Sequence, residues 1–162
     1  MLTLWSIFRS PLMLGCELTD LDEWTLGLIT TPEVLALLKD SRNAREILNV
    51  CDTIAWQAED EQGNTYLAVF NLGNLPAKRE ITLDKLGLSG EYTVHDLWGD
   101  QPDAVVSSGI VCSIDTHGAV LFKLTTNPNS PFLQNTTRKG GVFCSDQNRL
   151  IPIRSAAYSV QI

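Results

Sequence analysis

The feature that most restricts the fold of this chain of 162 residues is a change in hydrophobic spacing near residue 53. Before that point apolar residues recur at helical intervals, and after it they alternate with polar residues in short segments. Residues 54–58 and 65–72 flank the turn 60–64 and predict a β-hairpin. We expect further strands at 80–83, 92–97, 105–106, 110–114 and 119–124, separated by Gly-, Ser- and Asp-containing turns. This spacing is typical of an antiparallel β-sandwich of about seven strands.

The first fifty residues predict helices instead. An apolar face at residues 4–8 indicates a helix that must end near Pro11, because proline breaks a helix interior. Thr19 is the expected N-cap of a second helix, whose first turn is rich in carboxylates. Thr31 is the expected cap of a third, with Pro32 at its first position, where the missing N–H is not needed.

A short apolar run at residues 12–14, ended by Gly15, predicts a buried strand between these helices. Such a strand needs neighbours on both edges to satisfy its backbone groups, and the first fifty residues contain none. We therefore expect residues 1–50 to be the incomplete end of a larger α/β architecture and residues 51–124 to form a complete β-domain.

The charge changes sign along the chain. Residues 1–123 contain 8 Lys and Arg against 18 Asp and Glu, whereas residues 124–162 contain 4 against 1. The change coincides with the turn-rich segment 125–131, so residues 125–162 are expected to be a separate, basic and irregular tail.

Composition also excludes several classes of partner. The net charge is −7 and no stripe of Lys and Arg is present, so we expect no nucleic-acid binding. No apolar run reaches the ~18–20 residues that a bilayer-spanning helix needs, so we expect no membrane insertion. The localisation stays open.

The sequence predicts neither a metal site nor a cofactor. The cysteines at 16, 51, 112 and 144 lack the close spacing of zinc or redox motifs, and there are two histidines. We expect the four thiols to be unpaired and mostly buried, although their even number permits three disulfide pairings.

Local clusters that could suggest a site have simpler explanations. His95 and Asp96 are adjacent on a predicted strand, so their side chains point to opposite faces, and Asp96 is expected to accept hydrogen bonds from the following turn. His117 is expected to be a turn residue, although Ser113 and Asp115 lie close to it in sequence. The alternating aromatic residues of the β-half indicate a sandwich core more than a sugar-binding platform; they are Trp56, Tyr66, Phe70, Tyr92 and Trp98.

Several segments together resemble the melibiase-type α-galactosidase family of glycoside hydrolases. Residues 5–12 follow a W-x-x-F-x-[SA]-P-L pattern that leads into that family's last barrel strand, and residues 28–36 resemble its last barrel helix. Thr31-Pro32 differs there from the usual Asn-Lys or Asn-Pro. The resemblance covers about residues 4–124. In the β-half it rests on Phe70-Asn71, on the Y-x-V-x-D-L-W pattern of residues 92–98, and on His117-Gly118-Ala119.

The resemblance implies that residues 1–50 are the last strand and helices of a (β/α)₈ barrel and residues 51–124 the family's C-terminal sandwich. It implies retaining hydrolysis of terminal α-galactosides by the parent enzyme, with two catalytic aspartates on barrel strands before the position of Trp5. Neither the K-x-D nor the W-N-D-P-D motif of the family occurs in the chain. We therefore assign no catalytic or sugar-binding residue. Glu17 is expected at most to contact the residues that line a sugar pocket, without contacting the sugar itself.

The chain alone is thus expected to be inactive, with galactosides as ligands of the intact parent enzyme. The alternative function is a carbohydrate-binding or protein-interaction β-sandwich module. A further expectation is self-association through the exposed end of the barrel, where Leu4, Trp5, Phe8, Leu12 and Leu14 lack partners.

Overall fold

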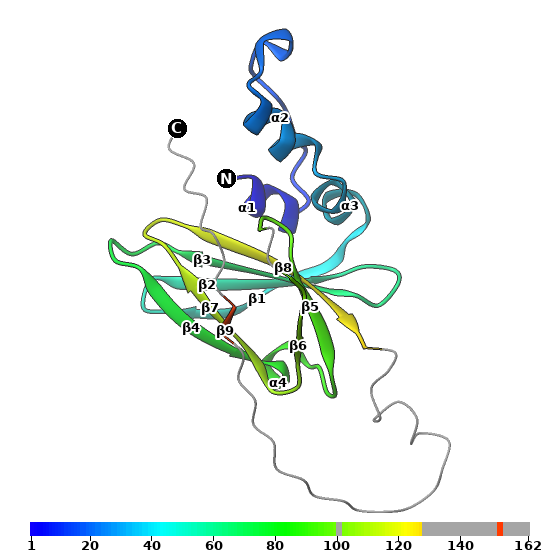
Figure 1. Cartoon of the computed structure of the whole chain (residues 1–162), viewed down its shortest axis with the longest axis vertical. Coiled ribbons are helices and arrows are strands. Elements are labelled where there is room, and N and C mark those ends of the chain that lie inside the picture. Colours follow the sequence, from blue (N-terminus) through cyan, green and yellow to red (C-terminus); the bar gives the residue numbers. More distant parts are fainter. Residues whose placement is uncertain (100–101, 128–151, 154–162) are drawn as a thin grey trace, which may run out of the picture.

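The computed structural model describes residues 1–99, 102–127 and 152–153 and consists of two β-sheets with helices over one of them (Figure 1). The larger sheet has six strands in the order β1-β2-β3-β8-β5-β6, all antiparallel. Its strands are β1 (Arg42–Val50), β2 (Thr53–Glu59), β3 (Thr65–Asn71), β8 (Ala119–Thr126), β5 (Tyr92–Asp96) and β6 (Ala104–Val106). The smaller sheet contains β4 (Ala77–Thr82), β7 (Gly109–Ile114) and β9 (Pro152–Ile153). The predicted antiparallel sandwich is confirmed.

The central strands are buried on both faces, which explains why their sequences are almost continuously apolar. In β3, Leu67 and Val69 face the core between the two sheets, whereas Tyr66 and Ala68 face the helices. The core between the sheets is completed by residues such as Ile81 of β4 and Phe122 of β8. Successive side chains of a central strand therefore pack alternately into two separate apolar layers, one between the sheets and one beneath the helices.

The helices are α1 (Leu2–Ile7), α2 (Glu23–Thr30), α3 (Pro32–Asp40) and the one-turn α4 (Leu83–Leu86), with a 3₁₀ turn at Leu18–Asp20. The predicted cap at Thr19 is wrong. Asp22 caps α2, because its carboxylate accepts a 2.8 Å hydrogen bond from the N–H of Thr25. Thr31 precedes α3 with Pro32 at the first position as expected, but the Thr31 hydroxyl donates back to Gly27 O instead of capping α3.

The predicted strand at residues 12–14 is also wrong. No strand forms there, and Met13 is 83% exposed. A β-strand is defined by its hydrogen-bonded neighbours, and no other strand of the described part of the chain lies alongside this segment.

The β-structure begins earlier than predicted. β1 pairs with β2 from Arg42↔Glu59 to Val50↔Thr53, so the sheet includes residues that the sequence interpretation grouped with the barrel end at 1–50. Most of β1 is exposed, which hides the alternation from sequence reading. The predicted strand at 80–83 ends earlier, since β4 stops at Thr82 and Leu83 begins α4.

The sandwich extends into the predicted tail, because Thr125 and Thr126 are the last residues of β8 and not the start of an irregular segment. Farther along the tail, Pro152–Ile153 form β9, which pairs in parallel with β7 at Val111↔Pro152 and Cys112↔Ile153. The rest of the predicted irregular tail, including Cys144, lies outside the described residues. Within the described residues, no helix combines the length and apolarity required to cross a membrane.

Candidate functional site

A second apolar cluster lies at the junction where α1 and α3 cover the outer face of the six-stranded sheet (Figure 1). Ile7 of α1 and Val34 and Leu37 of α3 are buried there. They belong to one apolar cluster with sheet residues such as Tyr66 and Leu121. Burial of this kind, at about 25 cal/mol per Å², is what holds the helices on the sandwich.

Polar and aromatic contacts supplement this apolar layer. The indole Nε1 of Trp98, after β5, donates a 2.9 Å hydrogen bond to the Thr3 hydroxyl of α1. The ring of Phe8, at the end of α1, meets that of Trp56 of β2 edge-on, with centroids 4.2 Å apart. The N-terminal helices are therefore fixed to the sheet through specific contacts at α1 as well as by burial.

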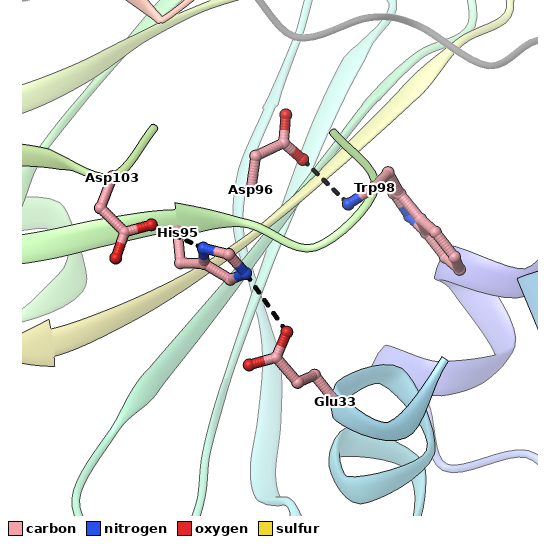
Figure 2. A network of polar contacts seen from close by, with 5 residues as sticks. All are labelled: Glu33, His95, Asp96, Trp98 and Asp103. Carbon is pink, nitrogen blue, oxygen red and sulfur yellow. Dashed lines mark hydrogen bonds and ion pairs between the residues drawn. The ribbon is translucent and has the colours of Figure 1, made fainter. Parts of the chain in front are cut away.

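A cluster of His95, Glu33 and Asp103 lies at the edge of the junction (Figure 2). His95 is on β5, and its Nε2 lies 3.2 Å from Glu33 Oε2 in the first turn of α3. Its Nδ1 lies 2.6 Å from Asp103 Oδ1, just before β6. Sequence reasoning missed this cluster because its members are far apart in the chain. The strand pattern predicted only that the His95 side chain lies on the opposite face of the sheet from that of Asp96.

The neighbouring Asp96 faces away from this cluster, as predicted for adjacent strand residues (Figure 2). Its Oδ1 accepts a 3.1 Å hydrogen bond from the N–H of Trp98, so the expectation that Asp96 serves the following turn is confirmed. His95 and Asp96 therefore do not form a dyad.

His117 is a turn residue. Its φ is +54°, and its Nε2 lies 3.1 Å from Asn74 Oδ1. The carbonyl of Asp115 accepts hydrogen bonds from the N–H of Gly118 and from the side-chain amide of Asn71. Asp115 thus holds the turn through its backbone, and the cluster offers no catalytic geometry.

Glu17 caps the 3₁₀ turn. Its Oε1 accepts hydrogen bonds from the hydroxyl of Thr19 at 2.7 Å and from the Thr19 N–H at 3.3 Å. These two bonds, the hydroxyl first, hold the pKa of Glu17 below its ordinary value. Its place beside a sugar pocket stays a prediction.

Retaining glycosidases need two carboxyl groups about 5–5.5 Å apart. Among the described residues two carboxylates are buried, Asp60 in the β2–β3 turn and Asp96 on β5. Asp60 directly follows β2, and β3 and β8 lie between β2 and β5, so three strand spacings, about 14 Å, separate the strands that carry the two residues. Each is bonded within its own turn, which leaves them no common reacting centre.

A surface hollow of about 460 Å³ contains two further carboxylates, those of Glu80 and Asp84. Both residues are exposed and face solvent beside hydroxyl side chains such as Ser108. In the described part of the chain, His, Cys, Asp and Glu side chains form no group of three able to hold a metal ion.

The cysteines differ from expectation. Cys16 and Cys51 are free and exposed, so the prediction of mostly buried thiols is wrong for these two. Cys112 is free and buried in the sandwich core, where burial raises the pKa of its thiol to about 12 and makes it unreactive.

The aromatic residues are buried or half-buried, but the prediction that they form the sandwich core holds only for Tyr92. Tyr92 belongs to the core between the sheets, while Trp56, Tyr66, Phe70 and Trp98 belong to the junction cluster beneath the helices. This packing leaves none of the five as an open platform for a sugar ring.

Comparison with known proteins identifies the β-half first. Residues 51–124 match the model of the alpha galactosidase C-terminal beta sandwich domain. Among curated proteins, the α-galactosidase of Cyamopsis tetragonoloba is 25% identical over 127 residues, covering 76% of this chain and 31% of its own length. The probable α-galactosidase of Dictyostelium discoideum is 27% identical over 134 residues, with 76% and 34% covered.

Solved structures of the same enzyme group share the fold. A GH27 β-L-arabinopyranosidase from Geobacillus stearothermophilus superposes with a TM-score of 0.76 at 36% identity, covering 80% of this chain and 30% of its own. α-Galactosidase I from Mortierella vinacea gives a TM-score of 0.71 at 26% identity, with 78% and 34% covered. The chain thus spans about a third of the length of the relatives it matches.

These matches cover 76–80% of the chain and are therefore longer than the sandwich domain at residues 51–124. Residues 51–124 are an alpha galactosidase C-terminal beta sandwich domain, and the chain fits a C-terminal portion of a melibiase-type glycoside hydrolase.

Proposed function

We propose that this chain supplies the C-terminal part of a retaining glycoside hydrolase that cleaves terminal α-galactosides, and that it has no such activity alone. The observation that carries the proposal is that five large apolar side chains of segment 12–26 are exposed. The relatives are about three times as long as this chain, so their additional residues can cover such side chains. The five side chains are Met13 at 83%, Leu14 at 42%, Leu18 at 59%, Trp24 at 49% and Leu26 at 47%.

Exposed apolar side chains in such number are expected to face other strands and helices of a barrel. The apolar run at residues 12–14 has the composition of an inner barrel strand, which forms only where neighbouring strands pair with both of its edges. The sandwich holds this segment in place through α1 and α3. The role of the chain is therefore architectural, while the reacting carboxylates belong to other barrel strands.

A graft tests this role. Residues 1–126 replace the matching C-terminal region of the Geobacillus stearothermophilus β-L-arabinopyranosidase, and hydrolysis of an aryl β-L-arabinopyranoside is compared with that of the enzyme lacking the region. The graft is expected to restore turnover. Leu37→Ala in the graft, which removes a fully buried contact of α3, is expected to lower it, and Leu35→Ala on the exposed side of α3 is the matched control. A soluble graft no more active than the truncated enzyme overturns the proposal.

The exposed apolar side chains of segment 12–26 support self-association of the chain in isolation. Phe8, expected from the sequence to lack a partner, packs instead against Trp56. Light scattering after size exclusion is expected to show a mass that rises with concentration, and Met13→Ser with Leu18→Ser is expected to reduce it. Leu75→Ser, at an equally exposed leucine between β3 and β4, is the control that leaves the mass unchanged. A monomer at every concentration contradicts self-association.

A further inference from the structure

The His95 cluster joins three segments that are distant in sequence. Glu33 lies in the first turn of α3, next to Val34, which is buried in the junction cluster. His95 is on β5 and Asp103 just precedes β6. Figure 2 shows the imidazole of His95 between the two carboxylates, of which that of Glu33 comes from the first turn of α3. The contact to Glu33 is therefore a direct side-chain link between the N-terminal helices and the sandwich.

The geometry requires a particular protonation state. Both ring nitrogens face carboxylate oxygens, Nε2 at 3.2 Å from Glu33 and Nδ1 at 2.6 Å from Asp103. A neutral imidazole carries one N–H, so it can donate to only one of them, whereas the imidazolium donates to both. An ionised carboxylate can only accept hydrogen bonds. When the imidazolium loses one proton, the nitrogen lone pair therefore faces the oxygen of one carboxylate, and that hydrogen bond is lost.

The surrounding charges favour the protonated ring. Glu33 approaches from α3 and Asp103 from the segment before β6, while Lys123 lies opposite His95 in register on β8. Lys123 places its ammonium 5.9 Å from the centre of the Tyr66 ring. The hydrogen bond that His95 donates to Asp103 is the largest cause that raises the pKa of His95, burial opposes it, and the charges of Glu33 and Asp103 add to the increase.

We propose that His95 is a proton-dependent latch that holds α3 on the six-stranded sheet when its ring is charged and weakens that attachment when the ring is neutral. The inference is independent of the proposed glycosidase role, since it concerns the docking of α3 alone. The apolar cluster of Ile7, Val34 and Leu37 persists in both states, so the latch changes local opening of α3 and not the fold of the sandwich.

The direction of the pH effect follows from the raised pKa. The contribution of the latch is complete below the ordinary histidine pKa of about 6.5 and is lost as the pH rises through the higher folded-state value. Attachment of α3 is therefore stronger in mildly acidic than in mildly alkaline solution.

Hydrogen exchange of the α3 amides, corrected for the intrinsic effect of pH, measures this opening at about pH 6 and about pH 8.5. The opening constant is expected to rise about two- to fivefold between them, the range that one partly exposed ion pair, that of His95 with Glu33, allows. His95→Gln is expected to open equally at both pH values. His117→Asn, which removes the other histidine and keeps a residue that tolerates positive φ, is the control that behaves like the parent chain.

Two further measurements separate the latch from a passive contact. Glu33→Gln is expected to lower the pKa of His95 seen by NMR and to abolish the pH dependence of α3 exchange. Asp103→Asn is expected to lower that pKa while leaving the contact to α3 in place. The latch is refuted by a corrected opening constant that does not change with pH, or by His95→Gln retaining the full pH dependence.

Discussion

At the scale of single residues, Asp60 shows how a buried carboxylate serves the fold of this protein. It accepts hydrogen bonds from the N–H groups of Gln62 and Asn64, from the Asn64 side chain and from the Tyr66 hydroxyl. Burial by itself would raise the pKa of Asp60, but these bonds outweigh it and leave the pKa below its ordinary value. The charged form thus stabilises the β2–β3 turn.

Asp60→Ala is expected to destabilise the protein by about 1–3 kcal/mol near pH 7, because several turn donors lose their acceptor. Urea unfolding measures the change, and Glu61→Ala in the same turn is the control, within about 0.5 kcal/mol of the parent. The stabilisation is complete above the unfolded pKa of about 3.9 and is lost as the pH falls through the lower folded value. An undiminished difference between parent and variant at lower pH contradicts this account.

Sequence reasoning at this scale succeeded where the partner is local. Strand parity and turn chemistry were enough to predict that Asp96 accepts a hydrogen bond from the turn after it, and the structure identifies the donor as the N–H of Trp98, two residues on. The pairing of His95 with Glu33 crosses 62 positions of the chain, and no spacing rule connects them. Only the docking of α3 on β5 brings the two together.

At the scale of elements, α3 has a distinct buried side. Leu37 is completely buried against the sheet, whereas Leu35 on the same helix is 38% exposed. Leu37→Ala is therefore expected to weaken the docked state by about 2–5 kcal/mol, through lost burial and the cavity it leaves. Leu35→Ala is expected to change it by about 0.5 kcal/mol or less. Unfolding followed by helical circular dichroism compares them, and equal effects refute the packing described here.

The start of α2 offers a second test at this scale. Asp22 accepts hydrogen bonds from both the N–H and the hydroxyl of Thr25. Asp22→Ala is expected to speed hydrogen exchange of the first α2 amides severalfold, because the helix loses its cap. Asp20→Ala, in the preceding 3₁₀ turn, is the control and leaves that exchange unchanged. If Asp20→Ala speeds this exchange more than Asp22→Ala does, the helix cap lies nearer Thr19 and the assignment of Asp22 as the cap is wrong.

The elements that were predicted well are those whose pattern reflects local physics. Short apolar or alternating runs bounded by turn residues predicted β2, β3, β5 and β8, because these strands bury one or both faces in the apolar layers. β1 was missed because most of its side chains are exposed, and it is recognisable as a strand only by its pairing with β2. The strand expected at residues 12–14 failed for the converse reason, since an apolar run without neighbours has no ladder to join.

At the scale of the whole molecule, the protein combines a folded sandwich with an apolar segment that is exposed. The two sheets and the helices at the junction explain how the chain folds, and its relatives are about three times longer. The chemistry of glycoside hydrolysis asks for two acids across a sugar bond, while the buried acids described here each stabilise their own turn. This is why we assign the chain a supporting role.

The most direct test of this assignment is an assay of the purified chain with an aryl α-galactoside. The account predicts release of the aryl group at the rate of buffer alone. It is contradicted by turnover that copurifies with the chain and is lost when Asp60 or Asp96 is replaced by Asn.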